Sequence, residues 1–143
     1  MDIDTIIQLF VILVLLIASY RDLKYKKLPI GFAMVIFIVG SFNRLIHLRF
    51  DFIIPSIFLF GFGYYLWKKN CIGGADVWLL PAVCPALPFI GLGSMFFIVM
   101  AFIILFGVLS VAYAKIYSLL YNDEYIPLIP IILLAYIILV LRY

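Results

Sequence analysis

Two aspartates beside apolar segments are the residues best suited to chemistry. Asp22 follows the first apolar run of the chain, and Asp76 ends the short sequence Gly73-Gly74-Ala75-Asp76. Two carboxylates that share one water repel each other's charge, so one stays protonated near neutral pH while the other stays ionised. The ionised group can take a proton from water that attacks a peptide carbonyl, and the protonated group can donate to the oxyanion or the leaving amine. Such a pair needs no metal and no cofactor.

Each aspartate also has a structural interpretation. Asp76 could stabilise the start of a helix, because the helix dipole favours a carboxylate there. Asp22 could pair with a neighbouring basic side chain at a membrane surface. Gly73 and Gly74 favour the catalytic interpretation, since they let a substrate backbone approach closely and allow unusual backbone dihedrals.

The composition indicates the environment in which these aspartates lie. Of the 143 residues, 69% are hydrophobic and 12% are charged, with a mean hydropathy of +1.31. Soluble domains are about half apolar and about a quarter charged, so this chain is expected in a lipid bilayer. The composition excludes a disordered, coiled-coil, collagen-like or disulfide-rich protein. A net charge of +3 indicates no nucleic-acid partner.

Uncharged apolar runs predict six transmembrane helices and therefore an all-α polytopic membrane bundle, with residues 1–143 as a single domain. A bilayer needs roughly 20 apolar residues per helix, or a few less where the ends snorkel. The runs cover residues 5–20, 28–42, 52–67, 77–114 and 126–141. The long fourth run is divided by Pro85, Pro88 and a turn at 91–94, and its prolines should kink or shorten the first of its two helices.

Basic residues predict the orientation of this bundle. Seven of the ten lie on one side, after the first and third helices or near the end of the fifth; they are Arg21, Lys24, Lys26, Lys27, Lys68, Lys69 and Lys115. The other three are Arg44, Arg49 and Arg142. The positive-inside rule then places loops 1, 3 and 5 in the cytoplasm and both termini outside. Asp22 and Asp76 would share the cytoplasmic face of a multi-pass cell-membrane protein.

Three segments resemble those of the type IV prepilin peptidases. The sequence at 73–76 is similar to the Gly-x-Gly-Asp motif of that family, in the form common among archaeal members. Asp22 with Leu28-Pro29 resembles the family's first aspartate and its Leu/Ile-Pro-Asn/Asp ending. The sequence Ile-Pro-Leu-Ile-Pro at 126–130 resembles the segment that begins the last helix. The resemblance spans nearly the whole chain.

The chain also departs from the family pattern at three positions. Ala75 stands in place of a motif glycine, Ile30 in place of Asn or Asp, and Trp78 where bacterial members often have lysine. These departures concern substrate contacts more than the aspartates. The chain carries no cysteine-rich methyltransferase half, so we expect proteolysis without N-methylation, as in archaeal preflagellin and prepilin peptidases or the short bacterial Flp-type enzymes.

The resemblance implies a membrane aspartic endopeptidase with Asp22 and Asp76 as the catalytic pair. Its substrates would be pilin-like or archaellin precursors, cleaved between a basic leader and a hydrophobic helix at the cytoplasmic membrane surface. Gly73, Gly74, Ala75 and Pro29 would shape the approach of the substrate. Asp123 and Glu124 could attract the basic leader, or could only solvate their loop and offset Lys115.

Two other functions are compatible with the same residues. A presenilin-like protease also uses Gly-x-Gly-Asp, but it would cut within the bilayer and place its aspartates inside longer helices. A small carrier or an assembly subunit would use the aspartates as proton or cation sites, although no inverted repeat is visible. The sequence does not indicate an oligomeric state.

Overall fold

The computed structural model describes residues 3–70, 72–88, 95–120 and 126–142, and these residues form helices and no strands. The elements are α1 (Ile3–Tyr25), α2 (Gly31–Ile46), α3 (Ile53–Lys68), α4 (Gly74–Val83), the 3-10 turn η1 (Cys84–Ala86), α5 (Met95–Leu120) and α6 (Ile129–Arg142). Each predicted run holds one helix, and the long fourth run contributes to two. The predicted all-α fold is therefore confirmed.

Membrane crossing is clearest for two of these helices. By length and composition, α1 with 23 residues and α5 with 26 are long and apolar enough to cross a membrane. The helices α2 and α3 have 16 residues each, α6 has 14 and α4 has 10. Six crossings therefore stay a prediction.

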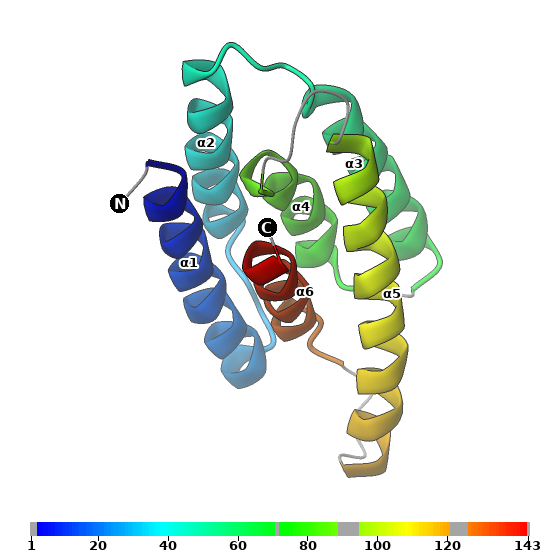
Figure 1. The fold of residues 1–143 in the computed structure, drawn as a ribbon. Coiled ribbons are helices and arrows are strands. Elements are labelled where there is room, and N and C mark those ends of the chain that lie inside the picture. Colours follow the sequence, from blue (N-terminus) through cyan, green and yellow to red (C-terminus); the bar gives the residue numbers. More distant parts are fainter. Residues whose placement is uncertain (1–2, 71, 89–94, 121–125, 143) are drawn as a thin grey trace.

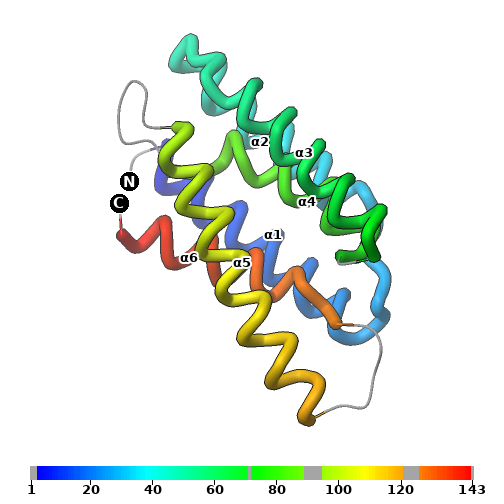
Figure 2. The backbone as a smooth tube through the Cα atoms, turned by 90° about the vertical axis from the view of Figure 1, so that its right-hand side faces the viewer, coloured from blue at the N-terminus to red at the C-terminus, as the bar shows by residue number. Residues whose placement is uncertain are grey.

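The helices form a bundle in which, in the view of Figure 1, α4 and α6 lie between α1 and α2 on one side and α3 and α5 on the other. Along the chain each helix runs opposite to the preceding one, and the start of α1 lies at the same end of the bundle as the end of α6 (Figure 2). The helix α4 packs on α2 and α3, while α6 packs on α1 and α5. Large apolar side chains on the outer faces, such as Leu13, Ile54 and Phe97, are more than half exposed, as expected for surfaces in contact with lipid.

The prolines shorten α4 as the sequence predicts. Pro81 lies inside the helix, which ends at Val83, and Pro85 lies in the 3-10 turn that follows. Proline lacks an N–H and cannot continue the α-helical ladder, so the carbonyls beyond this point need other donors.

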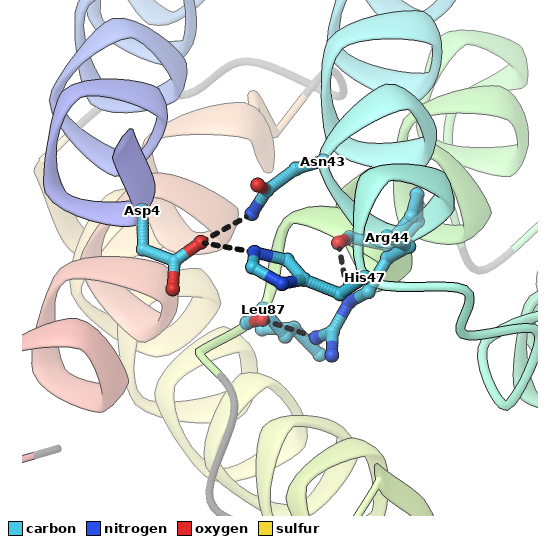
Figure 3. A network of polar contacts seen from close by, with 6 residues as sticks. Asp4, Asn43, Arg44, His47 and Leu87 are labelled. Carbon is cyan, nitrogen blue, oxygen red and sulfur yellow. Dashed lines mark hydrogen bonds and ion pairs between the residues drawn. The ribbon is translucent and has the colours of Figure 1, made fainter. Parts of the chain in front are cut away.

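Two buried side chains supply those donors. Arg44 Nη2 donates to the carbonyl of Leu87 at 2.6 Å (Figure 3). Arg44 Nε donates to the carbonyl of Pro85 at 3.0 Å. The Tyr136 hydroxyl of α6 donates to the carbonyl of Ala86 at 2.8 Å. Arg44, which the sequence analysis counted only as a basic charge on the outer side, lies in the last turn of α2 and is 3% exposed.

A polar contact near Arg44 joins the start of α1 to the end of α2. Asn43 Nδ2 donates to Asp4 Oδ1 at 2.7 Å, and His47 Nε2 lies 3.9 Å from the same oxygen (Figure 3). Asp4 and His47 are both about half exposed. Exposed ion pairs of this kind contribute little to stability.

The close packing of α2 on the end of α4 gives a first prediction. A Cβ added at Gly40 would lie 2.8 Å from the backbone nitrogen of Ala86, so Gly40→Ala forces the two elements apart. We expect it to lower the free energy of unfolding by about 1–3 kcal/mol. Gly61→Ala in α3 is the control, because a Cβ there meets nothing within 4 Å and alanine favours the helix. Thermal unfolding in detergent should separate the two variants, and equal melting temperatures would contradict this account.

Candidate active site

Asp22 lies in the last turns of α1 and is almost completely buried. The residue is 1% exposed, and its Oδ2 accepts a hydrogen bond of 3.4 Å from the backbone N–H of Ile129, the first residue of α6. The N–H groups of the first helical turn have no partner within the helix and carry the positive end of its dipole. The packing of α6 on α1 therefore gives this carboxylate an anion-favouring contact.

Asp76 is the third residue of α4 and is 4% exposed. Its Oδ2 accepts a hydrogen bond of 3.1 Å from the backbone N–H of Gly73, the residue that precedes the helix. A complete capping box has two hydrogen bonds, one made by each of its two side chains. Only the Asp76 side chain takes part here, because Gly73 has no side chain to accept from the backbone N–H of Asp76. Asp76 therefore does cap the start of α4, as its structural interpretation proposed.

The two carboxylates lie close enough to influence each other. Asp76 precedes the uncharged run that begins at Val77, at the edge of the apolar segment. Burial raises the pKa of Asp76 most, the Asp22 carboxylate raises it further, and the bond from Gly73 only partly opposes them, so the pKa is about 7. A cap alone would keep Asp76 ionised, whereas here one proton is available to the pair near neutral pH.

Of the two motif glycines, Gly73 is needed for space rather than for unusual dihedrals, whereas Gly74 has room for a Cβ. Gly73 has φ −71° and ψ 156°, an extended conformation open to any residue. A Cβ at Gly73 would lie 3.2 Å from Asp76 Oδ2, so a side chain there would push on the carboxylate. A Cβ at Gly74 would lie 3.6 Å from Trp67 Nε1, at ordinary contact distance.

Pro29 lies beside the motif in space. A cavity of about 310 Å³ joins the connection between α1 and α2 to the first turn of α4; its lining residues are Leu28, Pro29, Ile30, Ala33, Gly74, Ala75 and Trp78. The structure thereby brings three of the predicted substrate-approach residues, Pro29, Gly74 and Ala75, to one hollow. All three departures from the family pattern, Ile30, Ala75 and Trp78, line the same hollow.

Asp123 and Glu124, the candidate leader-binding acids, lie outside the described residues. Among the residues that are described, no group of three His, Cys, Asp or Glu side chains could hold a metal ion.

The contact between Asp22 and α6 was missed by the sequence analysis. The signal for it was present, because Pro130 lies near the start of an apolar run, and proline is common in the first turn of a helix. A helix start implies free N–H groups that a buried carboxylate can accept. Which carboxylate they would meet depended on the packing of α6 against α1.

The raised pKa of Asp76 predicts how stability depends on pH. The folded protein keeps this proton up to about pH 7, whereas an unfolded chain releases it near pH 4. Stability is therefore lost as the pH rises from about 4 to 7. Asp76→Asn removes this loss, so its melting temperature in detergent should exceed that of the unmodified protein at pH 8 and approach it at pH 5.

Asp22→Asn provides the matched test of the coupling between the carboxylates. It removes the neighbouring negative charge and should move the loss of stability to lower pH. If the stability of Asp22→Asn falls over the same pH range as that of the unmodified protein, the proximity of the pair is contradicted.

Comparison with known proteins identifies a family for the chain. Residues 9–142 match the sequence model of the type IV leader peptidase family, a range that includes both aspartates and Pro29. No curated protein and no solved structure matches the chain. The family and the two long apolar helices together indicate a membrane protein. Because the match covers nearly the whole chain, the resemblance seen in the motifs is confirmed and the protein belongs to the type IV leader peptidase family.

Proposed function

We propose that this protein is a membrane aspartic endopeptidase that removes the leader from pilin-like or archaellin precursors, without N-methylating the product. The observation that carries the proposal is the pair of buried carboxylates, Asp22 and Asp76, of which one has a pKa of about 7. A buried, coupled pair of this kind is suited to acid–base chemistry on a water molecule. Membership of a leader peptidase family supports the choice of a peptide bond as the target.

The surroundings of each carboxylate suggest its role in the reaction. Asp76, with the raised pKa, holds the shared proton at rest. Asp22, which accepts from the first N–H of α6, is the ionised partner and takes a proton from water. The resulting hydroxide adds to the carbonyl carbon while Asp76 protonates its oxygen. Asp22 then protonates the nitrogen as the C–N bond breaks, and one hydroxyl of the tetrahedral intermediate returns its proton to Asp76, which leaves the new carboxylic acid.

The precursor would bring its basic leader to the cytoplasmic end of the bundle. In the proposed orientation the chain crosses the membrane six times, with loops 1, 3 and 5 in the cytoplasm and both termini outside. Asp123 and Glu124 belong to loop 5 and could attract the leader, or could only keep that loop solvated. The presence of Asp22 within one turn of the end of α1, and of Asp76 in the first turn of α4, supports cleavage at the membrane surface over cleavage inside the bilayer.

The catalytic role predicts a large loss of activity in each aspartate variant. Asp22→Asn and Asp76→Asn keep the shape of the side chain but cannot exchange the proton, so we expect the processing rate to fall at least about a hundredfold. Asp51→Asn, which alters an exposed carboxylate in the connection between α2 and α3, should process normally. The measurement is the size shift of a co-expressed precursor with a Lys/Arg-Gly leader junction. Normal processing by either active-site variant, present in the membrane at the usual level, would refute the proposal.

The proposed orientation predicts which loops react with a reagent that cannot cross the membrane. A cysteine in place of Lys69, after α3, should react only after the cytoplasmic side has been opened. A cysteine in place of Leu48, which is 82% exposed between α2 and α3, should react in intact cells. Both tests are made with Cys71 and Cys84 replaced by serine. The opposite labelling pattern would reverse the orientation and place the aspartates outside.

A further inference from the structure

A second cavity lies on the other side of the motif glycines. It has a volume of about 620 Å³ and is bordered by α3, by α5, by Gly73 and Gly74, and by the segment that leads into α6. The helix α3 packs mainly against α4, and α5 packs mainly against α6. The space between α3 and α5 is therefore left open along part of their length.

This cavity is continuous with the segments that hold both carboxylates. Gly73, whose N–H binds Asp76, is part of its wall. Leu128 is also part of the wall, and it directly precedes Ile129, whose N–H binds Asp22. A chain lying in the cavity would reach the proposed catalytic pair at its end.

The wall formed by α5 is suited to a helix. Its lining residues run from Ile103 to Ala114, which corresponds to about 16 Å along the helix axis. Gly107, Ser110 and Ala114 are small and lie about one turn apart, a spacing that lets helix backbones approach closely in membranes. A Cβ added at Gly107 would meet nothing within 4 Å.

One polar group interrupts this otherwise apolar wall. The Ser110 hydroxyl is buried and has no hydrogen-bond partner among the residues that the structure describes. A hydroxyl left unsatisfied in apolar surroundings is costly, and hydroxyls commonly bond across helix–helix contacts in membranes. An inserted chain could supply the missing partner.

We propose that the cavity between α3 and α5 binds the apolar helix that follows the scissile bond of the precursor. This rests on the proposed function, because such a helix has to lie in the membrane while its first peptide bond reaches Asp22 and Asp76. A segment in lipid must satisfy its own backbone groups and is therefore helical. The small residues of α5 accommodate a helix, and the contact of the cavity with Gly73 and Leu128 aligns the end of that helix with the catalytic pair.

Filling the cavity should weaken substrate binding without changing the chemistry. Gly107→Leu adds a side chain to open space in the wall, so we expect it to raise the KM for a helix-bearing precursor roughly tenfold with little change in kcat. Gly61→Leu is the matched control, because this glycine in α3 also meets nothing within 4 Å but lies outside the cavity. Membrane level and melting temperature show that both variants fold. Equal KM values for the two variants, or a loss confined to kcat, would overturn the docking site.

Cross-linking tests the identity of the occupant independently. A photoreactive residue in place of Val111, which lines the cavity and is 72% exposed, should cross-link to the apolar helix of the precursor. The same residue in place of Val108, which is 63% exposed on α5 but does not line the cavity, should not. Cross-links only to lipid, or only to a second copy of this chain, would refute the proposal. Such a result would not contradict the proposed function, because that function is tested separately by the processing activity of Asp22→Asn and Asp76→Asn.

Discussion

Backbone polar groups in an apolar bundle need hydrogen-bond partners within the protein, and the position of α4 depends on how this need is met. The prolines end the helix after only ten residues. The carbonyls beyond its end are bonded by two side chains from other helices, Arg44 of α2 and Tyr136 of α6. A short helix capped in this way can be enclosed by longer ones. Its opposite end then holds Asp76 at the level of the last turns of α1, where Asp22 lies.

Backbone N–H groups at helix starts, which have no partner within their helix, also bond the two carboxylates. The first N–H of α6 bonds Asp22, and the N–H that precedes α4 bonds Asp76. Helix starts favour ionised carboxylates, while burial and mutual repulsion oppose two charges at one place. For Asp76 burial and repulsion prevail, so its pKa rises to about 7. An anion beside a proton-holding partner is the arrangement that the proposed chemistry uses.

Much of the fold could be predicted because its signals are local. Apolar runs, the prolines after Asp76 and the turn sequences each predict an element or a boundary, and the described helices agree with them. The hydrogen bonds of Arg44 could not be predicted, because sequence alone does not show whether a basic residue at a helix end faces water or carbonyls from another segment. The dihedral argument for Gly73 failed for a similar reason, since its need for glycine comes from the neighbouring Asp76 carboxylate.

The sequence by itself determined the membrane environment, the helical class and the two aspartates with their motif, because composition and short-range spacing carry that information. Only the tertiary structure decided that the Asp22 carboxylate lies near enough to Asp76 to raise its pKa. It also decided that the N–H groups of α6 reach Asp22, and that α3 and α5 leave an open cavity beside Gly73. These features arise from packing between segments far apart in the chain, and their energies depend on burial and on distances that no local pattern encodes.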